Sequence, residues 1–576
     1  MLVNAHRIAL RVLLAALTLT LTLPLAALSA DQLAVKSDSD FRLFPGQDRV
    51  KANINVSLTN RAAPTYSIGP CTPGSSQRCR FTRTYYYDKF RYIFVPVGAT
   101  NVKFSPGVKP RLHKDTKHWK EYEVGFPNLN YGQTRKFKVT YELPGAKPRS
   151  KHHTRVMDAY TYFCWHGEPA DSGSVTAQLP PGYEATTFYG KTRTKSNKKG
   201  TTITGTFKGS PGKFYACTDA FKPSKLLRTD VTSPSGQQVT IEGWPEDPEW
   251  SETMVEAIET TLPELEDLIG RPMPLDEVVI REVTEQSLDG YASEFGVRRA
   301  LIRLGDHIDD PASAPRGLAM AWFNDRRVKD TWLQMGLSDW AGNEVGAYGC
   351  WPEGEYPGKG QPKLSKWKRL QEKPSEKQEA IHIWQYHAAC NLIEDMADRV
   401  GEERMHAVIA ALLDGTPKYG PEPTERSSKS KKPATWKDWL DAIDEVGLVP
   451  AGETDLTLAE QDLKDAGVAT GKQLKGRAKA RTAYHDALAG MDGTHMPRLI
   501  TNAMGKWDFK AAIGALPVAA AAYGEIMAND GMGDADRAAF LADFESAKSL
   551  KGLRNLKQKA TAFEPTSVEP AEPETE

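Results

Sequence analysis

The chain has 576 residues, of which 40% are hydrophobic and 26% are charged, and its formal net charge at pH 7 is zero. These proportions are ordinary for a soluble globular protein and exclude a fibrous or wholly disordered chain. The length predicts three or four domains, at about 100–200 residues each.

The neutral total hides two oppositely charged halves. Residues 31–230 hold 33 Lys or Arg against 15 Asp or Glu, whereas residues 231–576 hold 39 against 59. Two interpretations stay open. The halves dock against each other or simply differ in surface charge, or the basic half is a surface for acidic cell-envelope polymers or lipids.

The N-terminus predicts export. Positively charged side chains precede an apolar stretch, Val12–Leu28, which is short for a membrane span. We therefore expect a cleaved signal peptide over residues 1–30 and a secreted, extracytoplasmic mature chain, where nucleic acid is not an expected partner. The longest later apolar stretch, Ala511–Met527, is interrupted by a proline and a glutamate, so no transmembrane anchor is expected in the mature chain.

The six cysteines of an exported chain predict three disulfides. Six cysteines allow 15 pairings, so the sequence leaves the connectivity open. Proximity favours the pairs Cys71–Cys79, Cys164–Cys217 and Cys350–Cys390. No two cysteines form a CxxC pair, which speaks against a structural zinc site.

Residues 31–225 are predicted to form a basic, β-rich N-terminal domain. Apolar and polar residues alternate at 50–56, 91–95 and 135–141, and Gly/Pro turns separate these stretches. This period is typical of half-buried strands, so we expect a β-sandwich or saddle. The polar run Lys191–Gly200 is predicted to be a solvated hairpin tip.

Residues 226–453 alternate strand and helix patterns. Strands are predicted at 239–242 and 278–280, with a helix at 252–269 that Ser251 would cap. Further helices are predicted at 312–346, 376–414 and 436–446, and a polar loop at 416–434. This order indicates an α+β domain.

Residues 454–562 are Ala-rich and predict a helical C-terminal domain, and residues 563–576 predict a disordered acidic tail. The expected fold class is therefore multidomain α+β, with an N-terminal β-sandwich or saddle, a central α+β domain and a C-terminal all-α domain.

Two stretches of the central domain carry the most specific motif. Residues 316–324 read RGLAMAWFN, and residues 332–341 read WLQMGLSDWA. They resemble the M1 (aminopeptidase N-like) zinc metallopeptidases, in which HELAHxWF lies on one helix and WLxEGLAEY on the next. The resemblance implies that residues 226–453 form a thermolysin-like peptidase domain, and that the chain is a degenerate secreted bacterial member of that family.

The four chemical positions of the family motif hold different residues here. Arg316 and Met320 stand at the two histidine positions, Gly317 at the general base and Met335 at the third zinc ligand. Arginine offers no lone pair, glycine cannot accept a proton, and thioethers prefer softer metals than zinc. The resemblance thus implies a pseudo-peptidase with no catalytic residue, no metal site and no cofactor, although the family uses zinc.

The resemblance also suggests where a ligand cleft would lie. Relatives place a cleft-lining strand near residues 288–293, which makes Gly290, Tyr291 and Glu294 candidate cleft residues. Asp339 lies where a longer spacing would place the third ligand, but Trp332 and its neighbours favour the register that selects Met335.

Other groups have a less specific pattern. His382 and His387, like His113 and His118, are five residues apart, which puts neither pair on one helix or strand face. Met320 and Met335 together could offer a soft copper(I) site, but core methionines are far commoner.

Three functions follow as expectations. The favoured one is a secreted, catalytically inactive metallopeptidase-like protein that binds a peptide, a protein or an acidic envelope polymer in the inherited cleft. The second is an active metallopeptidase with non-aligned ligands, for which the nearest polar residues are Glu294, Asp306, His307, Asp309 and Asp310. The third is an adhesive envelope protein whose basic sandwich does the binding.

Overall fold

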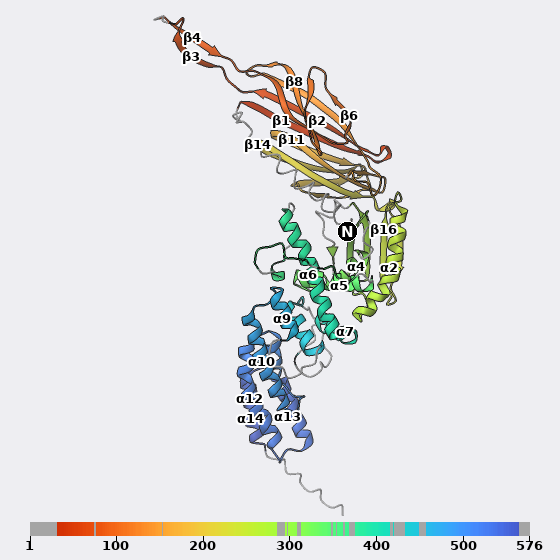
Figure 1. The fold of residues 1–576 in the computed structure, drawn as a ribbon, viewed down its shortest axis with the longest axis vertical. Coiled ribbons are helices and arrows are strands. Elements are labelled where there is room, and N and C mark those ends of the chain that lie inside the picture. The colour runs from red at the N-terminus through yellow and green to blue at the C-terminus, as the bar shows by residue number, and fades with distance from the viewer. Residues whose placement is uncertain are drawn as a thin grey trace, which may run out of the picture.

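The computed structural model describes residues 32–73, 77–152, 154–284, 294–296, 298–307, 313–346, 349–352, 354–360, 363–367, 375–414, 419, 432–447 and 457–563. The molecule is elongated (Figure 1). Strands fill one end, a mixed sheet with helices forms the middle, and helices alone form the other end. The chain is thus multidomain, with mixed sheets and a helical C-terminal region, as expected.

The β-rich end contains fourteen strands in the described residues, which confirms the strand prediction for this part of the chain. The long strands of its main sheet are β1 (Leu33–Phe44), β2 (Arg49–Asn60), β9 (Thr134–Pro144), β11 (Tyr160–Leu179) and β14 (Gly200–Phe221). The shorter strands are β3 (Thr65–Pro70), β4 (Arg78–Arg83), β5 (Tyr87–Pro96), β6 (Thr100–Phe104), β7 (Lys109–Asp115), β8 (Trp119–Leu129), β10 (Arg155–Val156), β12 (Glu184–Phe188) and β13 (Thr192–Asn197).

Twelve of these strands form two packed layers, whereas β3 and β4 pair only with each other. Nine of them make one sheet in the order β12-β14-β11-β1-β2-β9-β6, with β13 beside β14 and β10 beside β11, and a second sheet has the order β5-β8-β7. One core joins the layers, since Ile54 and Val139 of the large sheet are buried with Ile93 and Val124 of the small one. The alternation of the sequence therefore places apolar side chains between the sheets and polar ones outside.

The prediction of a hairpin tip at Lys191–Gly200 is wrong in extent. Residues Thr192–Asn197 form β13, which pairs with the start of β14 from Thr192 opposite Gly205 to Asn197 opposite Gly200. Only the two lysines between the paired strands make the turn. Backbone pairing does not require apolar side chains, so a wholly polar edge strand escaped the hydrophobic pattern.

Three disulfides tie the described chain together, and they join the pairs that proximity favours. Cys71–Cys79 closes the tip of the β3–β4 hairpin, which projects from the rest of the molecule (Figure 1). Cys164–Cys217 links the neighbouring strands β11 and β14, and Cys350–Cys390 links the segment after a central helix to the next helix. All six cysteines are paired, as is common in extracytoplasmic proteins.

The middle sheet has five strands in the order β15-β16-β17-β19-β18. Its strands are β15 (Leu227–Thr232), β16 (Gln238–Gly243), β17 (Glu277–Val283), β18 (Glu294–Phe295) and β19 (Arg299–Gly305). The three inner strands are parallel and the two outer strands antiparallel to their neighbours. Parallel neighbours cannot be joined by a tight turn, so β16 and β17 need a crossover connection, which explains the strand–helix–strand order of residues 238–283.

Helix α2 (Pro248–Ile269) is the crossover between β16 and β17. The predicted cap at Ser251 is wrong, because the helix begins earlier: the Asp247 carboxylate accepts a hydrogen bond from the Trp250 amide, and Pro248 occupies the first turn. Asp before Pro is a strong helix start. Ser251 instead lies inside the helix and is buried.

The remaining helices of the middle part surround one large core. They are α4 (Ser313–Phe323), α5 (Thr331–Val345), α6 (Glu376–Val400), α7 (Glu402–Asp414), α8 (Trp436–Ala442) with a π-helical turn at Ile443–Gly447, and α9 (Leu458–Asp465). The core includes Leu463 of α9 and extends to Leu474. The hydrophobic packing therefore continues past residue 453, where the sequence predicts a domain boundary. The predicted loop at 416–434 and the predicted acidic tail lie almost entirely outside the described residues.

The C-terminal part is a helical bundle. It consists of α10 (Gly471–Ala489), α11 (Arg498–Gly505), α12 (Phe509–Ala528), α13 (Asp534–Ser546) and α14 (Leu550–Thr561). By length and composition α12 alone, within the described part of the chain, is apolar enough to cross a membrane. However, Ala512, Ala519 and Ile526 on one face of α12 are fully buried in the bundle core, which is the pattern of a core helix.

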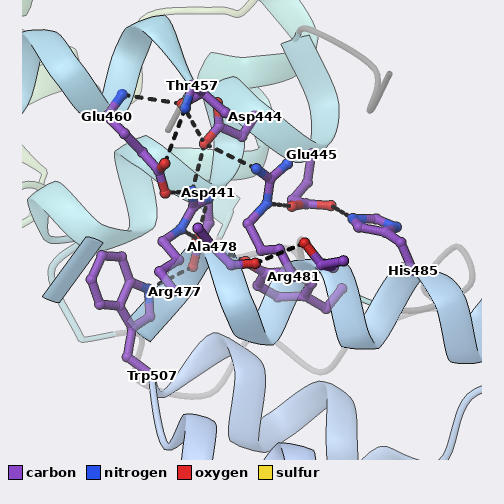
Figure 2. Close-up of polar contacts among 12 residues, drawn as sticks. Asp441, Asp444, Glu445, Thr457, Glu460, Arg477, Ala478, Arg481, His485 and Trp507 are labelled. Carbon is purple, nitrogen blue, oxygen red and sulfur yellow. Dashed lines mark hydrogen bonds and ion pairs between the residues drawn. The ribbon is translucent and has the colours of Figure 1, made fainter. Parts of the chain in front are cut away.

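A buried ion network joins the middle part to the bundle (Figure 2). Arg477 of α10 is fully buried, and its guanidinium lies 2.8 Å from Asp441, 2.6 Å from Asp444 and 2.7 Å from Glu460. One turn further along α10, Arg481 contacts Glu445 at 2.5 Å. The network thus connects α8, the π-helical turn, α9 and α10.

Candidate functional site

The candidate site lies on the helix hairpin α4–α5. The apolar positions of the motif point inward: Leu318, Trp322, Leu333 and Leu337 are all buried in the core of the middle part. Arg316, Gly317, Met320 and Met335, which stand at the chemical positions of the family motif, are only partly buried. The period of the motif therefore separates a packing face from a partly open face on both helices.

The packing of α4 against the sheet explains the glycine at position 317. A Cβ atom at this position would lie 3.1 Å from a methyl carbon of Ile302 on β19. This distance is too short for a side chain unless the neighbour moves. The glycine lets α4 approach the sheet closely, although glycine inside a helix costs about 1 kcal/mol relative to alanine.

Gly342 and Gly336 bring α5 close to its neighbouring helices. A Cβ on Gly342 would lie 2.4 Å from the backbone nitrogen of Arg316, and one on Gly336 would lie 2.7 Å from the carbonyl oxygen of Ala389 on α6. Three helices therefore meet with backbone against backbone. The Cys350–Cys390 disulfide anchors the segment after α5 to α6 at the same place.

Arg316 on α4 and Asp339 on α5 are oppositely charged residues of this hairpin. Asp339 lies on α5 one turn after Met335 and is partly buried. Burial raises the pKa of its carboxyl to about 7, and the guanidinium of Arg316 offsets that rise only in part. Burial also lowers the pKa of His387 on α6, and Arg316 lowers it further. One cation thus stands close to a carboxyl and an imidazole.

The donor set of the motif does not fit zinc. Zinc in such a site needs three ligands with available lone pairs and an open fourth position. The guanidinium of Arg316 provides none and repels a divalent cation, and the thioether of Met335 packs against the core. In the part of the chain that the structure describes, no group of three or more His, Cys, Asp or Glu side chains could hold a metal ion.

The non-aligned candidates are also used for other contacts. Asp306 is buried and forms a 3.0 Å ion pair with Arg155, at the junction with the β-rich part. Glu294 is mostly exposed and contacts Arg303 at 3.1 Å. These two residues therefore serve separate ion pairs. Gly290, Tyr291, Asp309 and Asp310 lie outside the described residues.

The histidine pairs do not act together. The indole N–H of Trp367 donates a 3.1 Å hydrogen bond to Nδ1 of His382, whereas His387 stacks on Trp351. His113 lies on the exposed strand β7, and His118 lies in the turn before β8. Neither pair converges on one point, as their spacing predicts.

Two groups of contacts were not predicted from the sequence. The first is the coupling of Arg316 to Asp339 and His387, which depends on the packing of α4 against α5 and of α5 against α6. The second is the Arg477 network. The sequence does contain a signal for this network. Arg477, Arg481 and His485 repeat every four residues on one face of α10, and the acidic residues of 441–445 recur at helical spacing.

Asp339→Asn should make the protein more stable above pH 7 and leave it unchanged below pH 4. The folded-state pKa is about 7 against an ordinary 3.8, so the folded state holds a proton that the unfolded state releases. Stability is therefore lost as the pH rises through this window, and removing the carboxyl avoids the loss, by about 1–3 kcal/mol.

Urea unfolding at several pH values measures this effect. The exposed Asp325 after α4 provides the matched control, since Asp325→Asn should keep the profile of the unchanged protein. A variant at Asp339 that is equally destabilised at every pH would contradict the prediction, because it would mean that Asp339 is ionised throughout and held by its neighbours.

The fold and the site together define a disulfide-bonded, multidomain protein with a charged helix hairpin packed beside a mixed sheet. No protein-family model matches the chain, and no curated protein matches it. Among solved structures, an M1 zinc metallopeptidase from Deinococcus radiodurans matches with a TM-score of 0.30 and 12% identity, over 76% of this chain and 94% of that one.

A mutant of the same Deinococcus radiodurans enzyme, with a bound Tyr-Ser-Ala substrate, matches with a TM-score of 0.30 and 13% identity, over 76% of this chain and 95% of that one. The structural neighbours are thus M1 zinc metallopeptidases. At this level of similarity neither the metal nor the activity of that enzyme transfers to this chain.

Proposed function

We propose that this protein is a non-catalytic, extracytoplasmic binding protein whose helix hairpin α4–α5 has the form of a zinc-peptidase motif but carries a fixed cation instead of a metal. The observation that carries the proposal is the position of Arg316. Its charge replaces the metal charge with a guanidinium that is already coupled to Asp339 and His387. The three disulfides support the extracytoplasmic part of the proposal.

The ligand of such a protein would be a peptide, another protein or a component of the cell envelope. A guanidinium is a strong partner for carboxylates and binds them through two parallel hydrogen bonds. Arg316 therefore suits an acidic side chain or a free C-terminal carboxylate of a ligand. A fold shared with an enzyme does not by itself carry the enzyme's activity, because function depends on the residues of the site.

Metal analysis of the purified full chain tests the proposal. After incubation with zinc and gel filtration, we expect no stoichiometric zinc and no hydrolysis of a mixed peptide library. One tightly retained zinc per chain, together with peptide cleavage that a chelator blocks, would sink it. Zinc added to Arg316→Ala distinguishes repulsion by the guanidinium from the lack of zinc ligands. The variant should still retain no zinc, since the other motif positions also lack suitable donors.

A hydrolase without a metal is the second candidate, and one observation favours it. A carboxyl with a pKa of about 7, as burial gives Asp339, is suited to take up a proton at neutral pH. Under this alternative the purified protein would cleave a substrate, and Asp339→Asn would abolish the cleavage without unfolding the chain.

A further inference from the structure

The outer side of the large sheet is a broad polar surface. Register brings alternate residues of six neighbouring strands into rows, so that Asp40, for example, lies between Asn53 on β2 and Thr176 on β11. We call this surface the polar face and define it as the outward side chains at alternate positions of 36–42, 51–57, 136–142, 172–178, 202–208 and 193–195. All of them are polar or charged.

The polar face has an excess of positive charge that the protein itself does not neutralise. Its three acidic side chains are already paired: Asp38 with Lys36 at 2.7 Å, Asp40 with Arg42 at 2.7 Å, and Glu142 with flanking basic residues of β2. Five exposed basic residues have no ion-pair partner among the described residues: Lys136, Lys138, Arg193, Lys195 and Lys208. Such an array attracts anions over several ångströms.

A hollow in the polar face lies beside two of the unpaired lysines, Lys136 and Lys138. It has a volume of about 540 Å³, and Lys36, Asn55, Ser57, Lys136 and Lys138 contribute to its walls. Neighbouring strands are about 4.8 Å apart, and alternate residues along a strand about 6.7 Å apart. Cations and hydrogen-bonding groups therefore repeat at short, regular intervals away from this hollow.

The chemistry of the polar face selects one class of occupant. Its Ser, Thr and Asn side chains both donate and accept hydrogen bonds, as sugar hydroxyls require. The face holds no aromatic side chain on which nucleic acid bases could stack, and its width suits an extended polymer. We propose that the polar face binds an acidic polysaccharide, with the acidic groups of the polymer on Lys136, Lys138 and the other unpaired cations. This site is separate from the α4–α5 hairpin and does not depend on its proposed function.

The experiment compares three polymers on the purified full chain by biolayer interferometry. Polygalacturonate is the acidic probe, dextran the neutral one and single-stranded DNA the nucleic acid. We expect binding to polygalacturonate alone, weakened at least tenfold when NaCl rises from about 50 mM to about 500 mM, because salt screens exposed charges. Tighter binding of DNA than of polygalacturonate, or equal binding of dextran, would overturn the proposal.

Charge-reversed variants locate the site. Lys136→Glu/Lys138→Glu should bind polygalacturonate at least tenfold more weakly, and so should Arg193→Glu/Lys195→Glu on β13, which keeps the test valid if one pair disturbs folding. The control is Lys548→Glu/Lys551→Glu, which changes the net charge equally on exposed positions of the helical end and should bind as the unchanged protein does. Unchanged binding by both sheet variants, or an equal loss in the control, would refute the polar face as the site.

Discussion

Arg477→Met should lower the free energy of unfolding by about 3–5 kcal/mol near neutral pH, because it removes the central cation from a buried cluster of carboxylates. Arg477 contacts Asp441, Asp444 and Glu460 within 2.8 Å and is itself fully buried (Figure 2). Methionine fills a similar volume, so the loss comes from uncompensated negative charge and not from a cavity.

The pH dependence of the loss identifies its cause. Burial raises the pKa of Asp441 and of Glu460, and Arg477 offsets the rise in both. Without Arg477 these pKa values rise further. A raised pKa favours the protonated folded state, so the variant should lose stability as the pH rises above about 4. Its deficit relative to the unchanged protein should be small in acid and full near neutrality.

Chemical denaturation followed by circular dichroism measures the deficit at each pH. Lys479→Met is the matched control, since Lys479 lies two residues away on the same helix and is exposed. It should change the stability by less than about 0.5 kcal/mol. A deficit in Arg477→Met that stays constant from acid to neutral pH would contradict the charge explanation and favour a packing one.

The same network shows what the sequence can and cannot predict. Periodicity located the helices of this region, because their buried faces repeat every three to four residues. It did not predict that α8, α9 and α10 meet at Arg477, because ion pairs depend on which helices become neighbours in space. Asp441 and Arg477 are 36 positions apart in the sequence, and no short-range sequence pattern predicts that the two side chains are in contact.

The strands likewise include some that the sequence predicts and one that it does not. Alternation at 50–56 and 135–141 identified β2 and β9, which have one face in the core. The polar strand β13 was missed, because its side chains carry no apolar signal and only its backbone joins the sheet. The disulfides were favoured by proximity in sequence, which succeeded here because all three close short or neighbouring segments.

At the candidate site, the sequence indicated which residues the motif positions hold but not why. Comparison of the sequence with the family motif shows that Gly317 stands at the position of the general base. The structure adds that a side chain there would press on Ile302. Likewise Asp339, which register arguments set aside, proves to be coupled to Arg316. Both facts depend on how closely helices and sheet approach, which no periodic pattern reports.

Gly342→Ala should destabilise the protein by about 2–3 kcal/mol, the cost of overpacking at a site that cannot relax. The added Cβ would lie 2.4 Å from the backbone nitrogen and 2.5 Å from the Cα of Arg316. Backbone atoms of a helix cannot move aside as a flexible side chain can, so α4 and α5 must separate. The separation should also move Arg316 away from Asp339.

Thermal and urea unfolding of Gly342→Ala, beside Gly514→Ala, test this argument. Gly514 lies inside α12, is exposed, and a Cβ there would meet nothing within 4 Å. Alanine should therefore stabilise that helix by up to about 1 kcal/mol. Replacement by alanine then changes the stability in opposite directions at these two helical glycines, because only Gly342 is in contact with the backbone of another helix. If Gly342→Ala were also stabilising, α4 and α5 would not be in backbone contact, and the close coupling of Arg316 to Asp339 would lose its structural basis.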